Sequence, residues 1–407
     1  MITLTDHQNH AYNEIVDFIG NDERFMVLTG YAGTGKSTVV TKIVNNYEEI
    51  REMYKLVGTD IPRSISATAT TNKAADHLQQ TIGIDCTTLH SAMALTLDYY
   101  TKKLKIRTRN SWNNLGFVIV DEASMVDTEL MDFIYQVAET TNAKFLFVGD
   151  PTQLPPVGED FSLAFESGFK TVALTEIIRQ PEGALRELCE DLRKQVLGTP
   201  ITGVNIDGIE ICHVDKETYN NLILEDMLRP DWIATKSKAL AFTNKAVAEI
   251  NKMVKTKLTG THKIQKFDYV INNKYFNGGN KECQMKTDQM VYVSQVEHDV
   301  TYKDILGCKV TVNHKFDVFV PYKMAQMNKY IKTLTVEEAL VVERNVADLR
   351  PLYASTVHKS QGSTYETVYV DIGNLATVLR FDQDLFHRLL YVATSRASVK
   401  VIYTGDV

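Results

Sequence analysis

The chain has 407 residues, of which 44% are hydrophobic and 23% are charged, with a net charge of −7. These values are ordinary for a globular protein of two or three domains, and they argue against a protein that binds nucleic acid through overall positive charge. No apolar run reaches the length of a membrane span, the N-terminus lacks a signal-peptide pattern, and the five cysteines form no C-x-x-C pair, so we expect a cytoplasmic protein without membrane, zinc or disulfide features.

The first motif along the chain is a phosphate-binding loop. The apolar run Phe25–Thr29 predicts a strand, residues 38–50 predict a helix, and between them Gly30–Ser37 fits G-x-x-x-x-G-K-[ST] without mismatch. In this context the backbone N–H groups surround phosphate oxygens, the lysine reaches the β- and γ-phosphates, and the serine hydroxyl binds Mg²⁺. The expected ATP-binding residues are Gly30, Ala32, Gly33, Thr34, Gly35, Lys36, Ser37 and Thr38.

Further apolar runs predict a parallel α/β fold up to about residue 175. Strands are expected at 63–67, 117–120, 145–148 and 171–174, with helical spacing near 72–80 and 128–140. Near-continuous apolar strands that alternate with helices are typical of a parallel sheet covered on both faces.

The remaining segments suggest a second α/β domain and two inserts. Residues 94–114 alternate apolar with polar or basic residues, which predicts a β-hairpin, and runs near 239–242, 367–370 and 399–403 resume the α/β pattern. Short alternating segments predict a small all-β insert over 268–345. We therefore expect a first domain over 1–178 and a second over 179–267 and 346–407.

Polar residues that follow the predicted strands complete a hydrolytic site. Asp121 and Glu122 come directly after one strand, where Asp121 would hold Mg²⁺ and Glu122 would orient or deprotonate water. Gln153 follows the next strand and could contact both the γ-phosphate and the attacking water. Arg179 and Arg396 could stabilise charge in the transition state, although an arginine taken alone is more often part of a surface ion pair.

The order of these motifs resembles superfamily 1 helicases, and within them the RecD- and Dda-like group called superfamily 1B. Arg179 matches the motif IV arginine, and Thr70 and Asn72 replace the usual proline and glycine of motif Ia. The other matching segments are Leu4–Gln8, Gly30–Ser37 (motif I), Ala69–Ala75 (Ia), Thr88–Ser91 (Ib), Val120–Met125 (II), Gly149–Val157 (III), Thr356–Thr364 (V) and Tyr391–Ala397 (VI).

The resemblance implies two RecA-like domains, with ATP and Mg²⁺ as cofactors, in a monomeric ATP-dependent DNA helicase that moves 5′→3′ on single-stranded DNA and opens forks or partial duplexes. Gln8 would recognise adenine, and Gly362 and Arg396 would contact the nucleotide. The hairpin would be a strand-separating pin, and the insert a small barrel of the SH3 type. The residues implied to contact DNA are Thr71, Lys73, His90, Thr356, His358 and Lys359.

Several alternatives stay open. Tyr99 and Tyr100 in the hairpin could stack on the split base pair or could equally pack the base of the hairpin itself. The same motifs would serve a nucleotide-gated single-strand clamp that does not unwind. A third possibility is an RNA helicase of the viral superfamily 1 kind.

Overall fold

The computed structural model describes residues 3–31, 33–97, 103–107, 109–176, 183–200, 203 and 206–406. The chain forms two compact units, the first comprising Met1–Cys212, Gln361–Thr364 and Ala376–Lys400 and the second His213–Ser360, Tyr365–Leu375 and Val401–Val407. Four residues singled out in the sequence, Ala32, Tyr99, Tyr100 and Arg179, lie outside the described residues.

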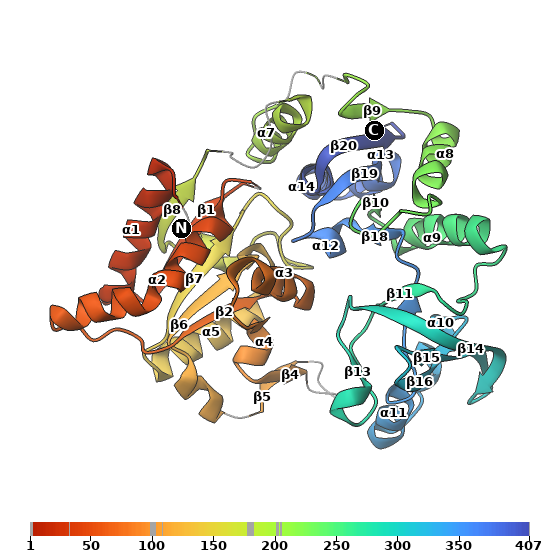
Figure 1. The fold of residues 1–407 in the computed structure, drawn as a ribbon, viewed down its shortest axis with the longest axis horizontal. Coiled ribbons are helices and arrows are strands. Elements are labelled where there is room, and N and C mark those ends of the chain that lie inside the picture. Colours follow the sequence, from red (N-terminus) through yellow and green to blue (C-terminus); the bar gives the residue numbers. More distant parts are fainter. Residues whose placement is uncertain are drawn as a thin grey trace. The chain divides into compact units, whose positions relative to one another are not determined.

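A parallel sheet forms the centre of the first unit (Figure 1), and its described strands follow the order β3-β2-β6-β7-β1-β8. Alternate strand residues enter different apolar clusters; Phe117 and Ile119 join one, and Val118 and Val120 join the other. The sheet is therefore buried on both faces, which confirms the predicted α/β class. The strands are β1 (Phe25–Gly30), β2 (Ile65–Ala69), β3 (Cys86–Thr88), β6 (Phe117–Asp121), β7 (Lys144–Gly149) and β8 (Lys170–Leu174).

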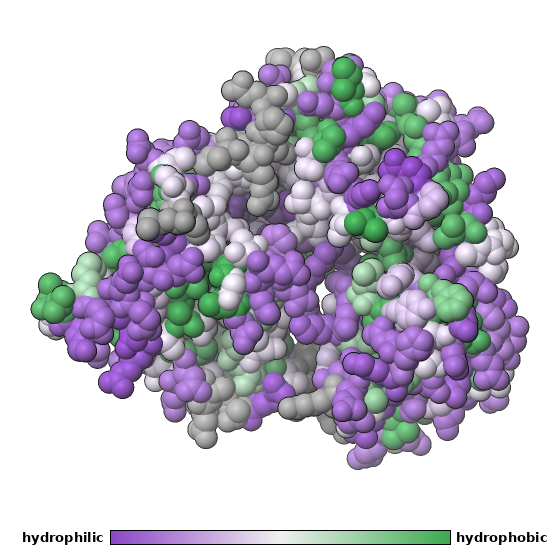
Figure 2. Space-filling view, in the orientation of Figure 1, coloured by the Kyte–Doolittle hydropathy of each residue, from purple (hydrophilic) through white to green (hydrophobic). Residues whose placement is uncertain are grey.

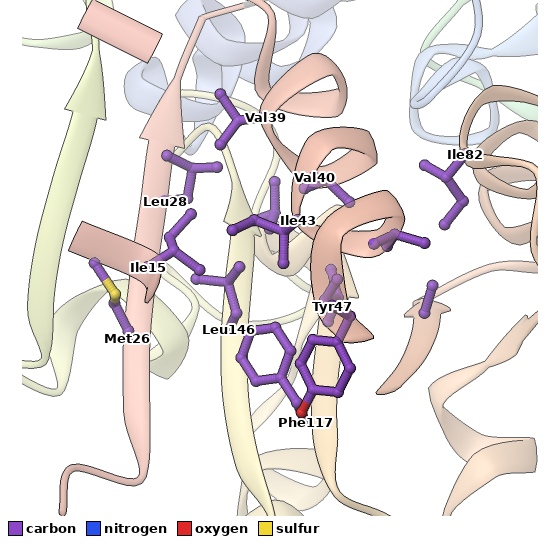
Figure 3. Packing of buried hydrophobic residues seen from close by; sticks show 14 of the residues in the cluster. Ile15, Met26, Leu28, Val39, Val40, Ile43, Tyr47, Ile82, Phe117 and Leu146 are labelled. Carbon is purple, nitrogen blue, oxygen red and sulfur yellow. The ribbon is translucent and has the colours of Figure 1, made fainter. Parts of the chain in front are cut away.

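Helices cover both faces of this sheet. One face packs against α1 (Asp6–Gly20), α2 (Lys36–Leu56) and α3 (Asn72–Ile82), whose apolar side chains interdigitate with those of the strands (Figure 3). The other face packs against α4 (Leu89–Ala92), α5 (Thr128–Thr140), α6 (Leu163–Glu166) and the 3₁₀ segments η1 (Arg109–Asn114) and η2 (Ala123–Met125). The first unit also contains α7 (Ala184–Val196), η4 (Ala376–Arg380) and α14 (Gln383–Ser395).

The predicted hairpin is present as two short antiparallel strands, β4 (Leu95–Leu97) and β5 (Leu104–Ile106). Leu95 pairs with Ile106, and the turn that joins the strands lies outside the described residues. Just beyond the hairpin, Trp112 is 2% exposed and its indole donates to the carbonyl of Met93 at 2.9 Å. The hairpin is thus attached to the core of the first unit at its base.

A second sheet has the order β18-β10-β19-β20-β9, and β10 is parallel to both of its neighbours, β18 and β19. Its strands are β9 (Ile211–His213), β10 (Ser237–Ala241), β18 (Ala354–Thr356), β19 (Tyr365–Asp371) and β20 (Ala397–Thr404). The helices that accompany it are α8 (Lys216–Met227), α9 (Asn244–Thr259), α12 (Val357–Ser360) and α13 (Ile372–Leu375).

The insert of the second unit contains an antiparallel sheet of order β16-β15-β14-β11-β17. Its strands are β11 (Tyr269–Asn272), β14 (Met290–Tyr302), β15 (Ile305–Val312), β16 (Phe316–Pro321) and β17 (Leu349–Arg350). A smaller ribbon pairs β12 (Phe276–Asn277) with β13 (Gln284–Met285), with η3 (Lys281–Cys283) between them.

The last part of this insert departs from the predicted all-β character. Residues 324–343 form two helices, α10 (Met324–Ile331) and α11 (Val336–Glu343). A capping box made by Thr335 and Glu338 starts α11. In α10, Met324, Met327 and Ile331 pack into one apolar cluster at helical rather than alternating spacing. Within the part of the chain that the structure describes, no helix is long and apolar enough to cross a membrane.

Candidate active site

The loop between β1 and α2 has the backbone that its glycines predict. Gly33 and Gly35 have φ angles of 85° and 86°, in the left-handed region that side chains disfavour. A Cβ atom on Gly35 would lie 2.1 Å from the side-chain nitrogen of Gln8, so a larger residue would also displace that side chain. The loop ends at the N-terminus of α2, where free N–H groups attract phosphate.

Gln8 braces this loop from the neighbouring helix α1. Its Oε1 accepts from the N–H of Thr5 at 3.2 Å, which closes a capping box at the start of the helix. Its Nε2 donates to the carbonyl of Thr34 at 3.3 Å, and the side chain is almost fully buried. Gln8 therefore contacts the phosphate loop directly, while its predicted contact with adenine stays a prediction.

The ammonium of Lys36 lies inside the loop. It donates to the carbonyls of Gly30 at 2.5 Å and Tyr31 at 2.9 Å. Burial lowers the pKa of Lys36, whereas the nearby carboxylates of Asp150, Glu122 and Asp121 oppose that shift. The ammonium of Lys36 is therefore a buried cation among several acidic groups.

The two motif II carboxylates lie at the end of β6. Burial and the adjacent charge of Glu122 raise the pKa of Asp121 to about 7. A divalent cation would relieve this crowding, and the hydroxyl-bearing Ser37 lines the same pocket as both carboxylates, so these residues fit Mg²⁺ by donor type. A Cβ atom on Gly362 would lie 3.4 Å from Oε1 of Glu122, which places motif V beside motif II.

Gln153 is 4% exposed and lines the same pocket. Among the described residues, its Oε1 atom has no hydrogen-bond donor within reach. A buried amide oxygen of this kind is costly unless a ligand or water meets it. Gln153 thus lies at the pocket, while its contact with the γ-phosphate and water stays a prediction.

Helix α14 holds the motif III loop through residues that the sequence analysis gave no role. The Arg388 guanidinium donates to the carbonyls of Pro151 at 2.7 Å and Gln153 at 3.0 Å. The Tyr391 hydroxyl donates to Oδ2 of the buried Asp150 at 2.7 Å. Arg388 lies eight residues before Arg396, about two helical turns, and that spacing is the signal that could have identified it.

Arg396 is the C-cap residue of α14 and is 5% exposed. Its guanidinium donates to the carbonyls of Ser363 and Val392, both at 3.3 Å, and to the hydroxyl of Ser395 at 3.2 Å. The structure thus brings together the predicted site residues Gly33, Gly35, Lys36, Ser37, Thr38, Asp121, Glu122, Gln153, Gly362 and Arg396 around one pocket.

The DNA-contacting residues predicted in the first unit follow two neighbouring strands. Thr71 caps α3 by accepting from the N–H of Ala74 at 3.2 Å, and Lys73 lies in the first turn of that helix. His90 lies in α4, directly after β3, and burial lowers its pKa. Because β2 and β3 are parallel neighbours, these residues lie at the same edge of the sheet.

The predicted contacts in the second unit, Thr356, His358 and Lys359, lie where β18 ends and α12 begins. The Thr356 hydroxyl accepts from the N–H of Lys359 at 3.3 Å. The His358 ring lies 6.2 Å from that of Phe242, and burial lowers its pKa. Roles in DNA binding stay predictions for both sets.

Comparison with known proteins gives two family matches. The AAA domain family matches residues 3–204, and the UvrD-like helicase C-terminal domain family matches residues 351–403. A probable conjugal transfer protein TraA of Sinorhizobium fredii is 27% identical over 97% of this chain, which spans only 32% of that protein. The ATP-dependent DNA helicase dda of Enterobacteria phage T4 is 22% identical, with 98% of this chain and 99% of that protein covered.

Solved structures show the same fold. A Pif1 helicase from Bacteroides, in complex with ADP-AlF3 and ssDNA, is similar with a TM-score of 0.53 at 18% identity and covers 100% of this chain and 94% of its own. At this identity the similarity concerns the fold alone, and it confirms the predicted pair of RecA-like domains.

Proposed function

Because the chain belongs to the superfamily 1B helicases, we propose that it is an ATP-dependent DNA helicase that moves 5′→3′ along single-stranded DNA and opens partial duplexes or forks. The dda protein is named a DNA helicase, and the Bacteroides Pif1 structure contains a nucleotide analogue and single-stranded DNA. The direction of movement and action as a monomer are part of this proposal.

The pocket of the first unit supports the proposal most directly. Lys36, Glu122 and Arg396 line it together, so one site contains a phosphate-binding cation, a carboxylate able to accept a proton and an arginine. Phosphoryl transfer needs positioning and charge stabilisation more than covalent chemistry, and this set provides both.

Each residue has a defined part in hydrolysis. On binding ATP, the Lys36 ammonium would exchange its two loop carbonyls for phosphate oxygens. Glu122 would orient water and accept its proton, and Arg396 would stabilise the charge that develops on the phosphoryl group. Mg²⁺, held by Ser37 and Asp121, would neutralise phosphate charge.

The nucleotide state would reach the rest of the protein through motif III. Gln153 lines the pocket, and its carbonyl accepts a hydrogen bond from Arg388 of α14, the helix whose C-cap is Arg396. A change in the contacts of Gln153 would therefore be transmitted to α14. Such a link is what a motor needs to couple hydrolysis to movement.

We would test the proposal by unwinding two matched partial duplexes, one with a 5′ single-stranded tail and one with a 3′ tail. The active protein should open the 5′-tailed duplex, and Lys36→Ala should abolish this activity. Lys55→Ala is the matched control, since that lysine lies on the same helix with a side chain 77% exposed. Its activity should equal that of the unaltered protein.

Other outcomes would each revise a separate part of the proposal. Opening of the 3′-tailed duplex alone would keep the motor and reverse its direction. ATPase stimulated by DNA without opening of either duplex would favour the clamp. Stronger ATPase stimulation by poly-U than by poly-dT would favour an RNA substrate.

A further inference from the structure

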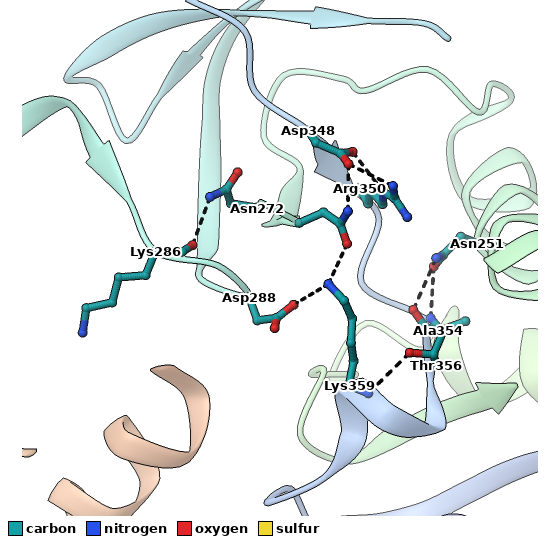
Figure 4. A network of polar contacts seen from close by, with 10 residues as sticks. Asn251, Asn272, Lys286, Asp288, Asp348, Arg350, Ala354, Thr356 and Lys359 are labelled. Carbon is teal, nitrogen blue, oxygen red and sulfur yellow. Dashed lines mark hydrogen bonds and ion pairs between the residues drawn. The ribbon is translucent and has the colours of Figure 1, made fainter. Parts of the chain in front are cut away.

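The motif V lysine, Lys359, is bound by two acceptors from the β insert (Figure 4). Its ammonium donates to Oδ1 of Asn273 at 2.6 Å and pairs with Oδ1 of Asp288 at 3.0 Å. The side chains of Lys359 and Asp288 are 36% and 24% exposed, so the ion pair is partly shielded from solvent. All three residues belong to the second unit.

The turn that carries Asp288 is fixed from within the insert. Asp288 has a φ angle of 61°, and its N–H donates to the carbonyl of Asn272 at 2.7 Å. The fully buried side chain of Asn272 donates to the carbonyls of Met285 at 3.1 Å and Lys286 at 3.0 Å. A left-handed aspartate persists only where its surroundings determine it, and here they hold its carboxylate toward Lys359.

Asn273 is oriented by a second set of contacts. Its N–H donates to the carbonyl of Asp348 at 2.8 Å, and its Nδ2 donates to the carboxylate of Asp348 at 2.7 Å. Arg350 holds that carboxylate through two hydrogen bonds of 2.9 Å. Since the amide nitrogen of Asn273 is engaged in this way, the amide oxygen faces Lys359 as an acceptor (Figure 4).

Lys359 lies in α12, directly after strand β18, whose backbone is held by neighbouring residues. The side chain of Asn251 binds the backbone of Tyr353 and Ala354 at 3.0 to 3.3 Å, and Thr356 continues β18 in register with Ala241 of β10. The lysine thus follows the carboxyl end of a parallel strand, the edge at which open α/β sheets bind ligands. Its ammonium has three N–H donors, of which Asn273 and Asp288 occupy two.

We propose that Asp288 sets the DNA affinity of this site. In the absence of DNA its carboxylate binds the Lys359 ammonium, and a backbone phosphate of single-stranded DNA replaces that carboxylate when DNA binds. The inference rests on the proposed contact between Lys359 and DNA. A carboxylate and a phosphate both present anionic oxygens to the ammonium, so they compete for it. This competition would make the phosphate contact at Lys359 weaker and therefore easier to release during movement.

The test is the binding of labelled oligo-dT, without nucleotide, by fluorescence anisotropy over a series of salt concentrations. Asp288→Asn should tighten binding roughly three- to tenfold at low salt. It should also steepen the slope of log K against log salt by about 0.7, the value for one more neutralised phosphate on a single strand. Unchanged or weaker binding would overturn the proposal.

Asp304→Asn is the matched control, since Asp304 is an exposed aspartate of the same insert with a φ angle of 58°. Asparagine tolerates left-handed backbone, so both variants should fold. The control should leave the affinity unchanged.

A double variant separates local exchange from general electrostatics. Lys359→Gln alone should weaken binding, and adding Asp288→Asn to it should then give no gain. A gain that persists without the lysine would overturn the proposed exchange while leaving DNA binding intact. If the unaltered protein fails to bind oligo-dT, the proposed function itself fails, which is a distinct result.

Discussion

Glu122 occupies a backbone conformation that few residues other than glycine adopt, with a φ angle of 53°. Its carbonyl accepts from the Thr70 hydroxyl at 3.4 Å, and its carboxylate lines the pocket that contains Lys36. Strained backbone is often concentrated where a side chain must be aimed at a reacting group. The proposed role of Glu122 as the proton acceptor can be tested by a single substitution.

Glu122→Gln should lower the ATPase rate by roughly 100-fold to 10,000-fold, because the amide keeps the shape of the side chain but cannot accept a proton. Binding of a fluorescent ATP analogue should persist. The measurement is steady-state ATPase with single-stranded DNA, together with the titration of the analogue. Glu166→Gln serves as control, since Glu166 is an exposed acid of the same unit in α6. Near-normal hydrolysis by Glu122→Gln would remove this residue from the mechanism.

At the scale of single elements, the C-terminal end of α1 is held by a lysine that lies 126 residues further along the chain than Phe18. The ammonium of Lys144, at the start of β7, donates to the carbonyls of Phe18 at 2.7 Å and of Asn21 at the C-terminal end of the helix. Lys144 is 6% exposed and also lies over the Phe18 ring. These carbonyls have no partner within the helix, so the lysine completes its end.

This contact predicts a defined pH dependence of stability. Burial lowers the pKa of Lys144 to about 8 from an ordinary value of 10.5. Between these values the unfolded chain binds more protons than the folded one, so the contribution of Lys144 to stability rises with pH. Below about pH 8 both states are protonated, and the contribution is constant.

Urea unfolding of the unaltered protein and of Lys144→Met, at pH 7.5 and at pH 9.5, measures the effect. The difference in unfolding free energy between the two proteins should shift by about 1–2 kcal/mol in favour of the unaltered protein at the higher pH. Lys55→Met, which changes an exposed lysine, should show no such shift. A constant difference for Lys144→Met would mean that the buried lysine titrates normally.

At the scale of the whole molecule, the sequence predicts what depends on local pattern. Apolar runs such as Phe117–Val120 and Phe145–Val148 identified the parallel strands, because strands covered on both faces need continuous apolar side chains. The polar residues after them, Asp121 and Gln153, do line one pocket. Residues 324–343 were misassigned because a region rich in short strands was extended across a capping box that starts a helix.

Contacts between distant segments could not be predicted in the same way. Arg388 binds the carbonyls of Pro151 and Gln153 across more than 230 positions, and the pairing of Lys359 with Asp288 joins a motif to an insert outside every motif. Backbone carbonyls carry no sequence signal, and the carboxylate of Asp288 is defined by a turn whose geometry depends on Asn272. Such partners are brought together by tertiary packing, which cannot be predicted from the residue pattern of a single sequence.

Strand separation is the property of the whole molecule that the hairpin is expected to provide. Leu95 is buried, and Leu104 and Ile106 pack against the same apolar cluster, so deleting the hairpin would damage the core of the first unit. The milder change Tyr99→Ser with Tyr100→Ser tests the stacking hypothesis without that damage. Stacking on an aromatic is worth about 1–3 kcal/mol per base, comparable with the mean of about 1.4 kcal/mol for one base-pair step of DNA.

If the tyrosines stack on the split base pair, the double serine variant should lose unwinding of the 5′-tailed duplex while its DNA-stimulated ATPase is retained. Tyr99→Phe with Tyr100→Phe should unwind normally, because the phenylalanine rings keep the stacking surface. Unwinding by the serine variant at the normal rate would contradict the pin. A lower melting temperature with equal losses of ATPase and unwinding would instead indicate that the tyrosines pack the hairpin, since damaged folding reduces both activities together.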